Sequence, residues 1–123
     1  MKVTKSQFYL IQLVVLVGVL GIAAAVVYAV VNYALEAEEL ARDTEQRLQV
    51  DRMFTTGEVY HSRMGEWSGV CDSIGVTDEV SCTEAWDGFS LEIMLPGGQF
   101  YCRDSEGFVG VHAGTRGSAT TCQ

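Results

Sequence analysis

The sequence predicts an α+β protein: a long N-terminal helix, transmembrane in its first half, packed against a small three-stranded antiparallel sheet. An uncharged apolar run extends from Phe8 to Val31, and no glycine or proline then occurs until Gly57. Short strand-like runs separated by turn residues follow near the C-terminus. These features divide the 123 residues into a basic leader (1–7), a transmembrane helix (8–33), its extracytoplasmic continuation (34–64) and a disulfide-bonded β head (65–123).

The apolar run exceeds the roughly 20 residues that a helix needs to cross a bilayer. Only Lys2 and Lys5 precede it, and all 16 carboxylates follow it. Because positive charge marks the cytoplasmic side, we expect a single pass through the cell membrane, with the N-terminus in the cytoplasm and the part after the apolar run outside the cytoplasm. Ala23–Ala25 could serve as a signal-peptide cleavage site, but the apolar run continues to Val31, which favours a retained anchor.

The continuation of the helix contains mostly strong helix formers, with Glu38–Arg42 and Asp43–Arg47 spaced as i,i+4 ion pairs. No breaker separates it from the apolar run, so one continuous helix is expected from Phe8 to Met64, ending at Gly65. Some of its side chains recur on one face, which another element must cover. They are Val50, Met53, Phe54, Gly57 and Tyr60.

Three strands are expected at 89–95, 99–103 and 108–112, joined by turns rich in glycine and acidic residues. The first alternates apolar and polar residues, as a half-buried strand does. Residues 65–88 are expected to form a loop, and the tail from Ala113 to be irregular.

Four cysteines follow the apolar run: Cys71, Cys82, Cys102 and Cys122. An even number in a small extracytoplasmic domain indicates disulfides, with three connectivities open. Sequential pairing is expected, because it closes a short loop beside the tryptophans and ties the tail to the middle strand. There is no CxxC pair, and His61 and His112 are not grouped with the cysteines, so neither zinc nor a cofactor is expected.

The part after the apolar run carries six arginines and 16 carboxylates, a net charge of −10. Such a surface repels nucleic acid, which is therefore not an expected partner. The sequence contains no nucleophile elbow, HExxH motif or phosphate-binding loop, so an enzyme is not expected.

The start of the apolar run, Phe8-Tyr9-Leu10-Ile11-Gln12-Leu13, resembles the methylation-motif start of type IV pilins and type II secretion pseudopilins, Phe-Thr-Leu-Ile-Glu-Leu. Gly21 falls where these proteins commonly have glycine, fourteenth from Phe8. Segments 67–71 and 100–105 resemble head segments of small pilin-like proteins. The resemblance implies a pilin-like fold and a structural role in which membrane helices bundle together.

Three positions depart from the family pattern. Gln7 stands where the prepilin peptidase cuts after glycine, so Gln7 and Phe8 form a possible processing site that is expected to stay largely uncut. Gln12 replaces the usual glutamate, and Ala29 replaces a helix-bending proline. In the family the glutamate is thought to neutralise the new N-terminal amine of a neighbouring subunit. An uncut chain offers no such amine, and a carboxylate in the bilayer would cost several kcal/mol.

Small residues recur along one face of the apolar run, a pattern that lets membrane helices approach closely. The residues expected to serve helix packing and assembly are Phe8, Gln12, Gly18, Gly21, Ala25 and Ala29.

The function expected is that of a minor pilin or pseudopilin-like structural subunit of a type IV pilus or type II secretion apparatus. Its partners would be other pilin-like subunits through the N-terminal helix, and the membrane, with a prepilin peptidase as a possible third partner. It would be a single-pass membrane protein, or part of a surface filament. The alternative is a single-pass protein whose disulfide-bonded head binds a ligand or partner outside the cytoplasm.

Overall fold

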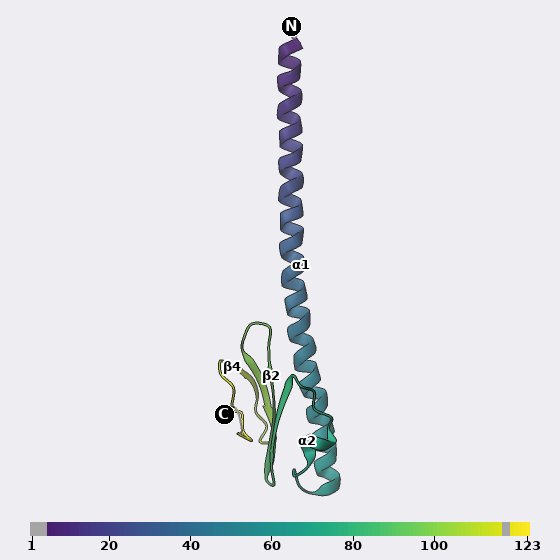
Figure 1. Cartoon of the computed structure of the whole chain (residues 1–123), viewed down its shortest axis with the longest axis vertical. Coiled ribbons are helices and arrows are strands. Elements are labelled where there is room, and N and C mark those ends of the chain that lie inside the picture. The colour runs from purple at the N-terminus through teal and green to yellow at the C-terminus, as the bar shows by residue number, and fades with distance from the viewer. Residues whose placement is uncertain (1–4, 117–118) are drawn as a thin grey trace. The chain divides into compact units, whose positions relative to one another are not determined.

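The helix α1, Lys5–Met64, is a single uninterrupted element of 60 residues (Figure 1). The computed structural model describes residues 5–116 and 119–123. Gly65 ends the helix with φ of 79°, and its N–H donates to the carbonyl of His61 at 2.8 Å. Glycine adopts this left-handed conformation without steric cost, which makes it the usual residue just past a helix. The expected continuous helix and its end at Gly65 are confirmed, although α1 is already helical at Lys5, three residues before the expected start at Phe8.

The chain divides into two compact units between Glu38 and Glu39. The first contains the apolar part of α1. The second, Glu39–Gln123, contains the rest of α1 and every other helix and strand described, and we call it the head unit.

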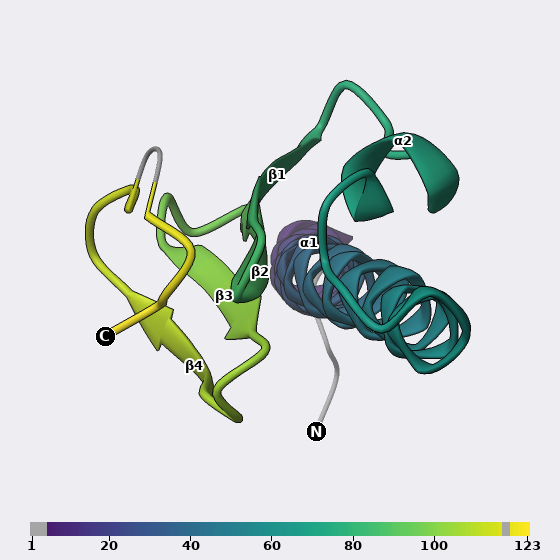
Figure 2. The same ribbon diagram turned by 90° about the horizontal axis from the view of Figure 1, so that it is seen from below.

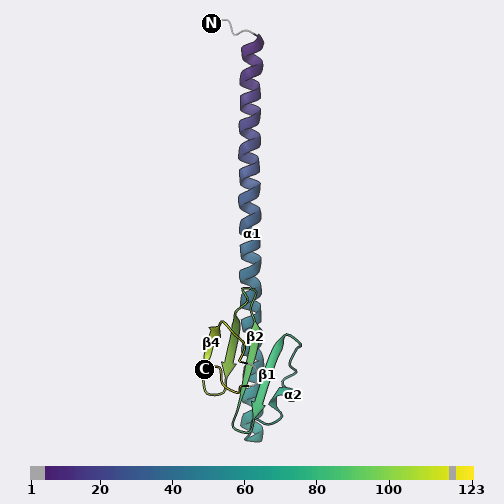
Figure 3. The same cartoon turned by 60° about the vertical axis from the view of Figure 1, so that its left-hand side comes forward.

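The head unit contains a four-stranded antiparallel sheet with strand order β1-β2-β3-β4 (Figure 3). Its strands are β1 Val80–Ala85, β2 Gly88–Met94, β3 Phe100–Asp104 and β4 Val109–His112. Each strand pairs with the next along the chain, as in a meander. The antiparallel sheet beside a long helix confirms the α+β class. The expectation of three strands was wrong, because the described residues form four.

The strand missed from the sequence is β1, which lies where a loop was expected at 65–88, together with the short helix α2, Val70–Ser73. Val80 is the one buried residue in β1, so the strand lacks a clear apolar alternation. Its extended conformation comes from pairing with β2 along its whole length, from Val80 opposite Ile93 to Ala85 opposite Gly88. Strand formation of this kind depends on the neighbouring strand more than on local propensity.

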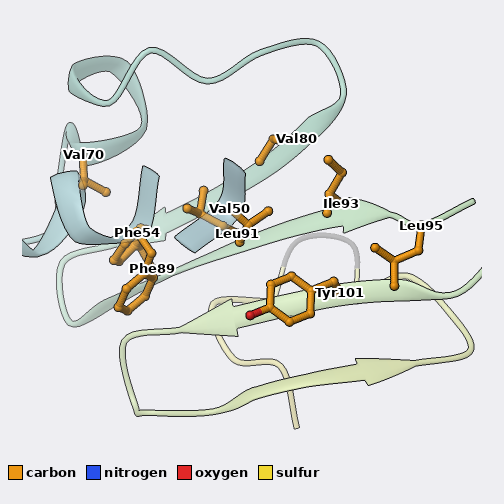
Figure 4. Close-up of a cluster of buried hydrophobic side chains, with 9 residues drawn as sticks. All are labelled: Val50, Phe54, Val70, Val80, Phe89, Leu91, Ile93, Leu95 and Tyr101. Carbon is orange, nitrogen blue, oxygen red and sulfur yellow. The ribbon is translucent and has the colours of Figure 1, made fainter. Parts of the chain in front are cut away.

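The hydrophobic core lies between the sheet and the second half of α1 (Figure 4). Val50 and Phe54 project from α1 and meet Phe89, Leu91 and Ile93 from β2, and all five side chains are buried. Met53 and Tyr60 pack against the edge of this cluster. The apolar face predicted on the helix is therefore the face that the sheet covers.

At Gly57, α1 comes close to the sheet. A Cβ atom at this position would lie 2.7 Å from Cζ of Phe89 and 3.2 Å from a methyl group of Val70. Glycine in a helix interior costs about 1 kcal/mol relative to alanine. Here its lack of a side chain leaves room for the Phe89 ring, which stacks on Phe54 with centroids 5.0 Å apart.

Two disulfides, Cys71–Cys82 and Cys102–Cys122, join the sheet to its flanking segments. The Cα atoms lie 5.9 Å and 5.8 Å apart, within the usual range. These are the two sequential pairs expected. The first links α2 to β1, and the second links β3 to the C-terminal tail.

Candidate functional site

The apolar part of α1 is exposed throughout. Its large apolar side chains between Phe8 and Val31 are each more than half exposed, and the most apolar stretch is not buried at all. Its length and composition make α1 a candidate membrane span, and the two disulfides fit an extracytoplasmic domain. Lipid would be the natural solvent for such a surface.

Every residue expected to serve assembly lies on this exposed part of α1. At about 100° of rotation per residue, Gly18, Gly21, Ala25 and Ala29 fall within roughly a quarter of the helix circumference. No atom of the described chain would lie within 4 Å of a Cβ at Gly18 or Gly21. Nothing in the described part of the chain therefore requires glycine at these two positions, and their packing against other helices stays a prediction.

The possible processing site is helical. Gln7 and Phe8 lie near the start of α1, and both are exposed. The leader residues 1–4, which include Lys2, fall outside the described residues.

A polar clamp formed by Asp51, Tyr101 and Arg103 holds the sheet against α1. The Tyr101 hydroxyl and Nη1 of Arg103 both donate to Oδ1 of Asp51, each at 2.9 Å. The Arg103 guanidinium also lies 4.3 Å above the centre of the Phe54 ring. The clamp thus fixes the position of β3 on the helix beside the apolar core. Its residues were missed from the sequence, because Asp51 and Tyr101 lie 50 positions apart.

Because of the clamp, the stability of the head unit should fall when the pH becomes alkaline. Burial raises the pKa of Tyr101 above its usual value, and the hydrogen bond to Asp51 and its negative charge act in the same direction. Since the folded state holds this proton more tightly than the unfolded state, the stabilisation is complete below pH about 10. It is lost as the pH rises through the folded-state pKa.

We expect the free energy of unfolding to fall more steeply above pH about 10 in the native chain than in Tyr101→Phe. Urea unfolding of the full chain in detergent, followed by tryptophan fluorescence at several pH values, measures the difference. Equal slopes for the two proteins would contradict the assignment, because the other tyrosines are common to both.

The C-terminal tail covers the face of the sheet that points away from α1 (Figure 2). All residues of β2 except Met94 are buried, including the polar Ser90 and Glu92. The Ser90 hydroxyl donates to the carbonyl of Ala119 at 2.8 Å, and the N–H of Arg116 donates to Glu92 at 2.9 Å. The polar side of β2, which looks solvent-facing in the sequence, is therefore a binding surface for the tail.

Asp104, at the end of β3, is fully buried and joins the tail to the β3–β4 turn. Its Oδ1 accepts the N–H groups of Glu106 and Phe108 at 3.1 Å and 2.9 Å. Its Oδ2 accepts the N–H of Cys122 at 2.7 Å. One carboxylate thereby satisfies three backbone donors in two separate segments.

Glu92, Cys102 and His112 come together on the same outer face. One potential metal-ligating atom from each lies within 4.8 Å of the others. They belong to β2, β3 and β4, with Glu92 opposite Cys102 and His112 two residues beyond the position opposite Cys102. The sequence placed His112 apart from the cysteines. The hairpin register was the signal that could have grouped them, because residues two apart share a face of a strand.

Searches of protein-family models, curated proteins and solved structures found no match to this chain. Its functional interpretation therefore rests on three features of its own residues. These are the apolar exposed helix, the head unit built on the same helix, and the polar groups beneath the tail.

Proposed function

We propose that this chain is a membrane-anchored structural subunit of the minor pilin or pseudopilin kind, serving a type IV pilus or a type II secretion apparatus. The observation that carries the proposal is the double use of α1. The helix presents an unburied apolar surface over its first half and supplies Val50 and Phe54 to the core of the head unit in its second half. A single helix then serves as membrane anchor, assembly element and foundation of the exposed head.

The charge distribution supports an orientation with the head unit outside the cytoplasm. Lys5 begins α1, and the next charged residue in the chain is Glu36. The positive side of the apolar stretch would face the cytoplasm. Both disulfides lie on the other side, where an oxidising compartment would preserve them.

The small-residue face of α1 supports assembly through helix packing. Apolar side chains gain no hydrophobic free energy by leaving lipid for another helix, so membrane helices associate chiefly by close packing. Gly18 and Gly21 leave the backbone open to a neighbouring helix, because nothing in the described chain occupies that space. The partners would be the helices of other pilin-like subunits.

The proposal predicts a specific cross-linking result. A photoreactive residue at Ala25, in the full chain in its native membrane, should form adducts with other pilin-like subunits. Replacing Gly18 and Gly21 together by leucine should remove them, because the added side chains hold the helices apart. Val19→Leu, on another face, is the matched control and should leave the adducts unchanged. Adducts with lipid alone would instead favour a solitary anchor whose head binds a ligand.

A second prediction concerns processing. Because Gln7 stands where the prepilin peptidase requires a small residue, the native chain should keep Met1 or Lys2 as its N-terminus. Gln7→Gly should restore cutting before Phe8 when a prepilin peptidase is present, whereas Gln12→Glu alone should not. Mass spectrometry of the intact protein distinguishes the forms. A native chain beginning at Phe8 would contradict the uncut form and favour a subunit that enters the filament in the usual way.

A further inference from the structure

The cluster of Glu92, Cys102 and His112 brings together side chains that could hold a metal ion. The three residues lie on neighbouring strands, and their ligating atoms lie within 4.8 Å of one another. Cys102 is bonded to Cys122, so the sulfur of Cys122 lies next to that of Cys102. Two sulfurs, one imidazole nitrogen and one carboxylate oxygen are four donors suited to tetrahedral zinc.

The two non-sulfur donors are already held in position by other groups. The Thr115 hydroxyl donates to Oε1 of Glu92 at 2.5 Å, and the N–H of Arg116 donates to Oε2 at 2.9 Å. Nδ1 of His112 bonds to the carbonyl of Gly114. Metal-binding histidines and carboxylates in proteins are characteristically oriented by partners of these kinds.

The arrangement leaves the other histidine nitrogen without a hydrogen-bond partner. Because a carbonyl only accepts, Nδ1 of His112 carries the hydrogen, so in the neutral ring Nε2 has a lone pair. This nitrogen is buried, has no hydrogen-bond partner among the described residues, and lies 3.4 Å from Oε2 of Glu92. The two side chains are only 11% and 8% exposed. Two buried lone-pair atoms that face each other repel, and a metal cation bound between them would remove this repulsion.

The oxidation state of the cysteines decides whether the sulfurs can take part. A disulfide sulfur is a poor ligand, since zinc is bound by thiolate. A dithiol reductant that transfers two electrons and two protons would convert Cys102 and Cys122 to thiols and itself become a disulfide. Binding of Zn²⁺ would then form two Zn–S bonds and release both thiol protons to solvent. Cys122 would stay near the site, because its N–H is held by Asp104.

We propose that the head unit contains a redox-gated zinc site, formed by Glu92, Cys102, His112 and Cys122 when the Cys102–Cys122 disulfide is reduced. The disulfide and the zinc ion are alternative links between the tail and the sheet. In an oxidising compartment the disulfide holds the tail on the sheet. Before oxidation the zinc ion would hold the tail in the same position. This revises the expectation of no metal, which rested on spacing along the chain. The Cys71–Cys82 disulfide belongs to no comparable group among the described residues.

Cobalt is the probe that tests the site, because tetrahedral Co²⁺ bound to thiolate has characteristic visible and near-ultraviolet absorption. The full chain in detergent is reduced with a phosphine, freed of reductant and titrated with Co²⁺, and Zn²⁺ is then added. One Co²⁺ should bind per reduced chain with the thiolate signature and be displaced by one Zn²⁺. The oxidised chain should show no such absorption.

Variants show whether the assigned residues bind the ion. His112→Ala and Glu92→Gln should each weaken Co²⁺ binding to the reduced chain by at least 10-fold, a loss of the size caused by removing even an outer partner. His61→Ala, which changes the only other histidine, is the matched control and should bind as the native chain does. The Cys71→Ser, Cys82→Ser double variant should also retain binding.

Three results would overturn the proposal. One is a reduced chain that binds no Co²⁺. Another is binding that is equal in His112→Ala and His61→Ala, which would reflect thiols of an unfolded chain. The third is binding that is lost in the Cys71→Ser, Cys82→Ser variant while far-ultraviolet circular dichroism shows that its fold is intact.

Discussion

Asp104→Ala is expected to lower the free energy of unfolding of the head unit by about 3 kcal/mol. The substitution removes the acceptor for the N–H groups of Glu106, Phe108 and Cys122. Hydrogen bonds to a charged acceptor are the stronger ones, and a buried donor left without a partner costs about 1–3 kcal/mol. Urea unfolding of the full chain in detergent, with both disulfides intact, measures the loss.

Two further variants separate the carboxylate's roles at Asp104. Asp104→Asn keeps one oxygen for the turn but presents an NH₂ group to one set of donors, so we expect a smaller loss of about 1–2 kcal/mol. Glu106→Ala changes an exposed acidic residue in the same turn and should have almost no effect. A loss in Glu106→Ala as large as that in Asp104→Ala would show that charge in the turn, rather than the buried hydrogen bonds, stabilises this region.

Phe89→Ala is expected to destabilise the head unit by about 3–5 kcal/mol. The Phe89 ring is fully buried between Phe54 and Trp67, with centroid distances of 5.0 Å and 4.7 Å. Its removal loses the free energy of burial, leaves a cavity and breaks two stacked contacts. Because Trp67 touches the cavity, its fluorescence should change in the folded state as well as in the unfolding transition.

The matched control for Phe89 is Trp86→Ala. Trp86 lies in the same β1–β2 hairpin, but its side chain is 77% exposed. Removing this larger aromatic residue should change the free energy of unfolding by less than about 0.5 kcal/mol. If both variants lost similar stability, aromatic content of the hairpin, rather than burial between α1 and the sheet, would be the cause.

Predictions from the sequence succeeded where the determining interactions are local. The helix follows from helix-forming residues without a breaker, and its end follows from Gly65, which alone can adopt the left-handed conformation there at no cost. The buried face containing Val50 and Phe54 follows from the 3.6-residue period. The disulfide pairs follow from the order of the cysteines along the chain. Each bond joins consecutive cysteines, 11 and 20 residues apart.

Predictions failed or were absent where contact with another element, rather than the local residue pattern, determines the structure. β1 is a strand because β2 pairs with it, although its own residues alternate poorly. In the clamp, Tyr101 and Arg103 lie 50 and 52 positions from Asp51 along the chain, and no local pattern marks them. The grouping of His112 with Cys102 likewise depends on strand register, which a linear spacing of cysteines and histidines does not contain.

The sequence by itself determined the long helix, its apolar first half and the existence of a small antiparallel sheet on its second half. These properties depend on hydrophobic period, helix propensity and turn residues, which act over a few positions. The tertiary structure alone decided that the polar side of β2 is buried, because the tail returns across it and Glu92 and Asp104 bind the tail's backbone. A buried carboxylate needs hydrogen-bond donors, and the folded arrangement alone brings the N–H groups of Arg116 and Cys122 to Glu92 and Asp104.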